Sequence, residues 1–368
     1  GNATREQIAQ SKALLGKMAQ GKGNLSDSLK LADPKTAVIY SVILDDHSEM
    51  ILQLADGTLK NYRVPMDTKL MQTEIDRLRA LLEKRSTDEY LFQAKKIYDA
   101  LIRPMEADIA AAKPSTLIFI QDGVLRKVPM AALHDGKEFL IQKYALARTP
   151  SLSLTSPKAY HGNFQGLIVG LTVERPPFEA LPNVRAEVTG VQKILGGTEL
   201  LDKSFTVKNF QEKLEKNSYP IVHMATHGKF GVDSESTFLL GYDSLITIDE
   251  LDKILRSRSA IASGSSSRRQ PVELLTLSAC QTAAGDNRSA LGIAGVAVRA
   301  GVKSALATLW FINDESTVPL VEEFYTQLRQ PNVTKAEALR RAQLKLIANE
   351  DYNHPAVWSP FLLIGNWL

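Results

Sequence analysis

The spacing of hydrophobic residues divides the chain into regions of different expected structure. Between residues 37 and 64 they gather in three short runs separated by polar turns, which is typical of an antiparallel β-meander. The expected strands are Ala37–Leu44, Met50–Leu54 and Thr58–Val64. Apolar residues then recur at helical spacing over about 67–84 and 88–103, and Pro104 is expected to end the second helix. This region is predicted to support the fold rather than to react.

Beyond residue 115 the pattern predicts alternating strands and helices. The expected strands are Thr116–Ile120, Phe139–Leu146, Gly166–Leu171, Pro220–Thr226, Val272–Leu277, Ser304–Leu309 and the apolar segment Phe361–Ile364. The expected helices lie at 182–195, 206–216, 247–255, 289–300, 314–329 and 334–348. Such alternation favours an α/β fold, in which helices flank a mostly parallel sheet on both faces. The meander and its two helices precede this sheet.

Three parts of the chain follow from these patterns. Residues 1–30 have a weak helical period and a polar end, so they are expected to be a leader or linker from an upstream region. Residues 31–160 are expected to form an N-terminal subdomain with the meander, helices and ancillary strands. Residues 161–368 are expected to form a C-terminal subdomain that contains the parallel sheet. A Ser- and Arg-rich insertion at about 256–270 is predicted to be an exposed, mobile loop.

Composition excludes several classes of function. The chain has 368 residues, of which 44% are hydrophobic and 23% charged, as in an ordinary globular protein. Lys and Arg number 44 against 41 Asp and Glu, so bulk charge suggests neither a nucleic-acid nor a membrane partner. A single cysteine forms no internal disulfide, and no apolar run approaches the roughly 18 residues of a membrane span. A cytoplasmic protein is expected.

The candidate chemistry lies at two strand ends. Cys280, the only cysteine, follows the run Val272–Leu277 and precedes a polar loop, while His227 ends another run and is followed by Gly228. In an open parallel sheet the reactive residues collect at the carboxyl ends of the strands. A nucleophilic thiol needs a base to take its proton, which an imidazole can do. The alternative is that Cys280 is a small buried hydrophobe.

Other templates fit less well. His223 and His227 share a face of the expected strand, yet Met224 stands where a zinc-helix motif has its general base, so no metal is expected. His223, inside the apolar run, is interpreted as a packed or supporting residue. Ser278 lacks the flanking glycines of a serine nucleophile elbow, and Gly292-Ile293-Ala294-Gly295 lacks the third glycine of a dinucleotide site. No cofactor is expected.

A strand ending in His-Gly and a second ending in Ala-Cys 53 residues later resemble the caspase-type cysteine peptidases, which include separase, legumain and the gingipains. Further motifs make residues 31–368 similar to the CHAT domain, a caspase-like domain associated with tetratricopeptide repeats. These motifs are Ile120-Gln121-Asp122-Gly123-Val124-Leu125, Ala225-Thr226-His227-Gly228, Leu277-Ser278-Ala279-Cys280-Gln281-Thr282, Ala307-Thr308-Leu309-Trp310, Phe324-Tyr325 and Trp358-Ser359-Pro360-Phe361.

The resemblance implies a caspase-like cysteine endopeptidase that makes limited regulatory cuts in a partner protein, with residues 161–368 as its catalytic subdomain. Cys280 would attack a peptide carbonyl, His227 would handle the protons, and the backbone N–H groups of Gly228 and Cys280 would hold the oxyanion. The sequence assigns no third catalytic residue. Upstream tetratricopeptide repeats or a regulatory protein are the other expected partners. Two alternatives stay open, a catalytically silent interaction module and an acyl transferase that uses the same two residues.

Substrate choice is assigned to Asp314, which resembles the acidic position of separase, an enzyme that cuts after arginine. A carboxylate there would bind the guanidinium through two hydrogen bonds. Asp314 can equally cap the helix that starts beside it. Asp286 and Glu235 are weaker candidates for the pocket. An arginine preference would make the insertion a candidate for self-cleavage, at Arg256, Arg258, Arg268 or Arg269.

Overall fold

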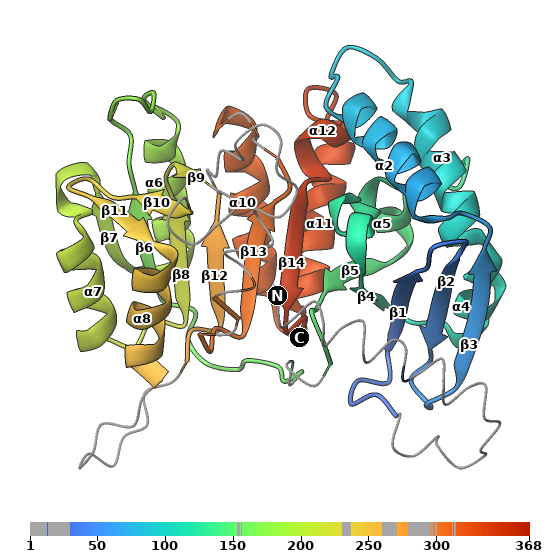
Figure 1. Cartoon of the computed structure of the whole chain (residues 1–368). Helices are drawn as coiled ribbons and strands as arrows, with labels where there is room; N and C mark the ends of the chain where they lie inside the picture. Colours follow the sequence, from blue (N-terminus) through green and yellow to red (C-terminus); the bar gives the residue numbers. More distant parts are fainter. Residues whose placement is uncertain are drawn as a thin grey trace. The chain divides into compact units, whose positions relative to one another are not determined.

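The computed structural model divides the chain into two compact units, drawn with their element labels in Figure 1. The first comprises Gly1–Pro157 and His354–Ser359, and the second comprises Lys158–Asn353 and Pro360–Leu368. The structure describes residues 13, 30–152, 155, 157–229, 237–259, 271–278, 295, 297–298, 300–310, 312 and 314–368, of which 257–259 and 314 are described by their backbone alone. Within these residues, no helix is both long and apolar enough to span a membrane.

The first unit contains a five-stranded portion of sheet in the order β3-β2-β1-β4-β5. Its strands are β1 (Thr36–Ile43), β2 (Ser48–Gln53), β3 (Leu59–Val64), β4 (Thr116–Ile120) and β5 (Ala145–Arg148). The first three pair antiparallel, which confirms the predicted meander, whereas β1, β4 and β5 pair parallel.

Short and long helices accompany this sheet. They are α2 (Thr68–Leu82), α3 (Tyr90–Leu101), α4 (Glu106–Ala112), α5 (Leu140–Lys143) and α12 (Pro355–Trp358), with 3-10 turns η2 (Arg103–Met105), η3 (Gly123–Lys127) and η4 (Met130–Ala132). Asp67 caps α2 by accepting a hydrogen bond from the backbone N–H of Leu70 at 2.7 Å. The second predicted helix ends at Leu101, ahead of Pro104, and α4 was not predicted.

The predicted strand Phe139–Leu146 is wrong over its first half. Residues 140–143 form the helical turn α5 instead, and β5 begins only at Ala145. The physical reason is a local side-chain bond, because Gln142 accepts the backbone N–H of Phe139 through Oε1 at 2.8 Å and so closes the turn. The apolar residues of this stretch had suggested an extended strand, and a run this short is compatible with either structure.

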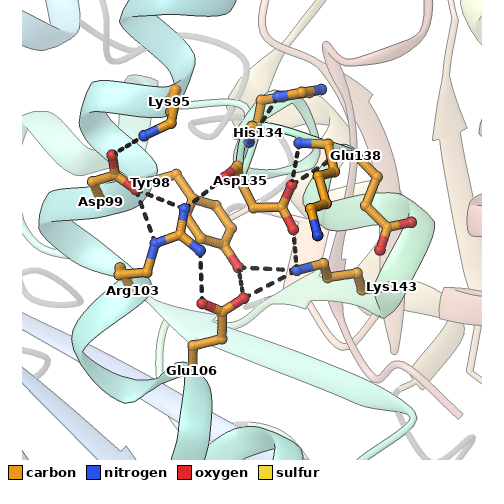
Figure 2. A network of polar contacts seen from close by, with 11 residues as sticks. Lys95, Tyr98, Asp99, Arg103, Glu106, His134, Asp135, Glu138 and Lys143 are labelled. Carbon is orange, nitrogen blue, oxygen red and sulfur yellow. Dashed lines mark hydrogen bonds and ion pairs between the residues drawn. The ribbon is translucent and has the colours of Figure 1, made fainter.

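A network of ion pairs and hydrogen bonds connects the helices of the first unit, as Figure 2 shows. Arg103 contacts the carboxylates of Asp99 and Glu106 at 2.8 Å each, and Lys143 contacts Glu106 at 3.1 Å and also Asp135. Burial alone would raise the pKa of Asp135, but Lys143 and two backbone N–H groups of the adjoining turn hold it well below its usual range. The network therefore joins α3, α4, α5 and the turn at Asp135 through charged groups that each contact an opposite charge.

The second unit contains a six-stranded portion of sheet in the order β14-β13-β12-β8-β6-β7. Its strands are β6 (Gly166–Gly170), β7 (Gly197–Leu201), β8 (Ile221–Ala225), β12 (Leu274–Leu277), β13 (Ser304–Thr308) and β14 (Phe361–Gly365). Neighbours pair parallel except β14, which runs antiparallel to β13. The predicted mostly parallel α/β sheet is confirmed. A small antiparallel sheet adds β9 (Gly228–Lys229), β10 (Phe238–Leu240) and β11 (Leu245–Thr247).

Helices cover both faces of this sheet. They are α6 (Val184–Leu195), α7 (Val207–Lys216), α8 (Ile248–Ser259), α10 (Asp314–Leu328) and α11 (Lys335–Ile347). Side-chain alternation along β8 separates the faces, since Val222 and Met224 share a core with α7 and α8, while His223 contacts α6 and α10. Of the predicted helix 289–300, most residues lie outside the described part of the chain.

Candidate active site

His227 lies just beyond the carboxyl end of β8, where two hydrogen bonds fix the bend in the chain. The hydroxyl of Thr226 donates to the carbonyl of Leu240 at 2.6 Å, and the N–H of Leu240 donates to the carbonyl of His227 at 2.8 Å. Gly228 then starts β9, paired with Leu239 of β10. The end of the central strand is thus tied to the small sheet, and the position of His227 is set by backbone pairing on both sides.

The imidazole of His227 is oriented by a backbone carbonyl. Its Nε2 lies 2.7 Å from the carbonyl oxygen of Glu179. A carbonyl oxygen only accepts, so Nε2 must carry the proton, and the neutral ring keeps its lone pair on Nδ1. Nδ1 is buried and makes no hydrogen bond to a described residue. The ring is therefore arranged to accept a proton at Nδ1, as a general base does.

The loop that carries Glu179 joins β6 to α6 and is anchored at several points. Two backbone hydrogen bonds, of 3.0 and 2.8 Å, link Arg175 and Phe178 to each other. The Arg175 guanidinium lies 4.3 Å from the centre of the Tyr242 ring. Asp202 accepts the backbone N–H of Thr172 at 2.7 Å. The Phe178 ring packs against the His227 ring, with 5.2 Å between their centres. The loop therefore covers the imidazole as well as orienting it.

The strand that leads to Cys280 lies directly beside β8. β12 pairs parallel with β8, with Leu277 opposite Met224, and the N–H of Ser278 donates to the carbonyl of Met224 at 3.1 Å. Both strands therefore end at the same edge of the sheet. Cys280 itself lies outside the described residues.

The structure describes only some of the other predicted site residues. Gly228 is described and begins β9. Asp314 is the first residue of α10, and its side chain is outside the described part of the chain. Asp286, Glu235 and most of the Ser- and Arg-rich insertion lie outside it too. Arg256 is described within α8, where its side chain pairs with Asp252 at 2.7 Å.

The family model of the CHAT domain matches residues 92–366, about three quarters of the chain. The chain belongs to the CHAT domain family. No curated protein matches its sequence. A chain in the crystal structure of the Saccharomyces cerevisiae separase–securin complex has a similar fold, with a TM-score of 0.53 and 9% sequence identity over 93% of this chain. This chain spans only 31% of the length of that one. The likeness confirms the caspase-like fold of the CHAT domain.

One functional group of this CHAT domain had no signal in the sequence. The carbonyl of Glu179 belongs to the backbone, and every residue has such a group, so no residue type marks it. What distinguishes it is the route of the loop, which the three-dimensional structure alone gives. The exposed carboxylate of Glu179 has no part in this contact.

Proposed function

We propose that this CHAT domain is a cysteine endopeptidase that makes limited cuts in a partner protein, with Cys280 as nucleophile and His227 as base. The register of β8 and β12 carries the proposal. Met224 and Leu277 are paired, and His227 and Cys280 each follow their paired residue by three positions. Because the strands are parallel neighbours, residues at equal distance beyond the paired positions leave the sheet at the same edge.

The chemistry follows from the tautomer of His227. Nδ1 takes the proton of the Cys280 thiol, and the thiolate attacks the carbonyl carbon of the scissile peptide bond. The carbon–nitrogen bond then breaks, and the imidazolium returns its proton to the leaving amine. Water hydrolyses the thioester, which restores the thiol. The carbonyl of Glu179 stabilises the imidazolium by accepting from Nε2 throughout, and the N–H groups of Gly228 and Cys280 are the proposed oxyanion donors.

Specificity for arginine is assigned to Asp314. This residue begins α10, which follows β13, the parallel neighbour of β12. His227, Cys280 and Asp314 therefore come after three adjacent parallel strands. A carboxylate at this edge of the sheet would pair with a guanidinium through two parallel hydrogen bonds. A helix-capping role of Asp314 is compatible with this one.

An arginyl chloromethyl ketone probe and a peptide library test the proposal. Wild-type protein is expected to be labelled, whereas Cys280→Ala and His227→Ala are not. Asp314→Asn is expected to lower kcat/KM for arginyl peptides roughly 10- to 100-fold, the effect of losing a charged hydrogen-bond partner. Glu315→Gln is the matched control, because it removes the adjacent exposed carboxylate and should leave kcat/KM unchanged.

Three outcomes would count against parts of the proposal. Labelling that persists without the thiol would exclude Cys280 as the nucleophile. A preference for acidic or apolar residues in the library would exclude the pocket assigned to Asp314. Folded protein that neither binds the probe nor cuts any peptide would favour the silent interaction module.

A further inference from the structure

Four polar side chains lie together in the layer between the sheet of the second unit and its helices α6 and α10. They are Glu187 of α6, His223 of β8, Thr276 of β12 and Tyr325 of α10. Each is at most 1% exposed. The chemistry proposed above uses none of them.

Direct contacts connect these four side chains in series. Nδ1 of His223 lies 3.1 Å from the hydroxyl oxygen of Tyr325, which donates its own proton to Thr276 Oγ1 at 2.7 Å. Burial raises the pKa of Tyr325, so this hydroxyl remains a donor over the ordinary pH range. Because its single proton goes to Thr276, the tyrosine oxygen accepts from His223, and Nδ1 of that ring is protonated.

The other ring nitrogen of His223 faces a carboxylate. Nε2 lies 2.9 Å from Oε1 of Glu187, although the two are not aligned as a hydrogen bond and neither carboxylate oxygen accepts one from a described residue. An ionised carboxylate buried without a partner is strongly disfavoured. The close approach of the His223 ring is therefore the contact that offsets the burial of the Glu187 carboxylate.

The placement of the network follows that of the proposed active site. Thr276 and His223 are paired in the sheet, four residues before Cys280 and His227 respectively. The two other members belong to α6, which follows the loop of Glu179, and to α10, which begins at Asp314. The network therefore joins β8 and β12, which precede His227 and Cys280 in the sequence, to α10, which begins at Asp314, and to α6, which follows the Glu179 loop.

Stability alone does not account for such an arrangement. Well-packed apolar side chains of similar volume stabilise a core as well as a buried charged or polar cluster does, and often better. What directed bonds add is a fixed relative position, because a hydrogen bond is sensitive to displacements that apolar contacts tolerate.

We infer that Tyr325, with Thr276 and the His223–Glu187 pair, positions the carboxyl ends of β8 and β12, the two strands after which the proposed catalytic residues His227 and Cys280 follow in the sequence. The inference rests on the proposed dyad. Tyr325 is a positioning residue here, since it acts through the strands and touches no reacting atom.

Alkylation by iodoacetamide tests this without any substrate. Cys280 is the only cysteine, so the rate reports on that thiol alone, and its pH dependence gives the apparent thiol pKa. Wild-type protein is expected to have an apparent pKa below the usual value of about 8.5, and His227→Ala should raise it. Tyr325→Phe and Thr276→Val are each expected to raise it by roughly half to one unit, which slows alkylation about three- to tenfold at pH 6. The double variant should be no slower than the slower single one.

A second tyrosine–threonine pair supplies the matched control. The hydroxyls of Tyr219 and Thr198 lie 2.5 Å apart in the same unit, and Tyr219 precedes β8, at its opposite end from His227. Tyr219→Phe should lower the thermal unfolding temperature about as much as Tyr325→Phe does, with no change in the alkylation profile.

The possible results separate the two proposals. A folded Tyr325→Phe protein with the wild-type profile, alongside a shifted His227→Ala profile, would overturn the positioning role and leave the dyad intact. A wild-type profile that His227→Ala does not move would overturn the dyad and the positioning role together. Slower alkylation in Tyr219→Phe as well would show a general effect of destabilisation and would likewise overturn the positioning role.

Discussion

At the scale of single residues, the imidazole of His227 receives its orientation from the backbone. A carboxylate partner would add charge and raise the basicity of the ring, whereas the carbonyl of Glu179 mainly fixes the tautomer and the direction of the lone pair. Phe178 restricts the ring from one side. The arrangement depends on the route of the β6–α6 loop, so substitutions that alter the loop path affect the ring without changing any group that titrates.

Gly170, at the end of β6, should not tolerate a side chain. A Cβ there would lie 2.7 Å from Val188 Cγ2 and 2.8 Å from Val184 Cγ1, both in the packed core. Gly170→Ala is expected to lower the free energy of unfolding by about 1–3 kcal/mol, as overpacking does. Urea denaturation monitored by circular dichroism measures it.

Gly190 of α6 is the matched control for this prediction. Its added Cβ would meet chiefly the carboxylate end of Glu322, and that flexible side chain can rotate away. Gly190→Ala is expected to be neutral or to stabilise the protein by up to about 1 kcal/mol, because alanine favours a helix interior. Equal loss of stability in both variants would contradict the packing argument.

At the scale of elements, α12 depends on a histidine cap. Nδ1 of His354 accepts the N–H of Ala356 at 3.1 Å, while Nε2 donates to the carbonyl of Thr87 at 3.2 Å. Only the neutral ring with its proton on Nε2 makes both bonds, because the imidazolium has no lone pair left to accept the N–H of Ala356. Burial lowers the pKa of His354, so as the pH falls below about 6.5 the unfolded chain takes up the proton first and stability is lost.

The expected size of this effect is that of one cap, up to about 1 kcal/mol between pH 7 and pH 5. His354→Asn keeps a capping side chain that does not titrate, so the difference in unfolding free energy between wild type and variant should shrink or reverse on acidification. Urea titrations at pH 7, 6 and 5 measure it. A difference that stays constant would show that His354 does not contribute to acid sensitivity.

Element boundaries divide what the sequence could predict from what it could not. The apolar runs of β1, β4, β8, β12 and β13 identified these strands because both faces of a parallel sheet are buried. β7 was missed, since Gly197–Leu201 lies at the sheet edge and is only partly buried. The turn at Phe139 was missed because Gln142 closes it through a side-chain bond.

The sequence indicated the candidate catalytic residues but not the buried side chains around them. His227 and Cys280 stood out because each follows an apolar run with a reactive group. The partners of His223 were hidden, because Glu187 and Tyr325 come from helices 36 residues before it and 102 residues after it in the chain. Periodicity shows which face of an element is buried, but it does not show which distant side chain meets it.

At the scale of the whole molecule, residues 354–368 contribute first to one unit and then to the other. α12 belongs to the first unit, and β14, which follows it after two residues, belongs to the second. Trp358 is fully buried with its ring centre 5.0 Å from that of Phe139, and Trp367 is 2% exposed in the second unit. Each unit therefore has a buried tryptophan from this segment in its core, Trp358 in the first unit and Trp367 in the second.

These two tryptophans allow each unit to be destabilised separately. Trp358→Ala is expected to cost about 3–5 kcal/mol and to accelerate amide hydrogen exchange in the first unit. Trp367→Ala is its counterpart and should accelerate exchange in the second. Exchange followed by mass spectrometry on peptides from β1–β4 and from β6–β8 distinguishes them. Identical exchange patterns in the two variants would contradict the division of the segment between the units.

The pairing of β8 with β12 bears on what a break in the backbone would do. A cut between Ser259 and Pro271 would leave His227 on one fragment and Cys280 on the other. Strand pairing would still hold the pieces together, because β12, β13 and β14 complete a sheet that β6, β7 and β8 begin, and the second fragment also supplies α12 to the first unit. Nicking would therefore turn one polypeptide into a two-chain protein without releasing either product.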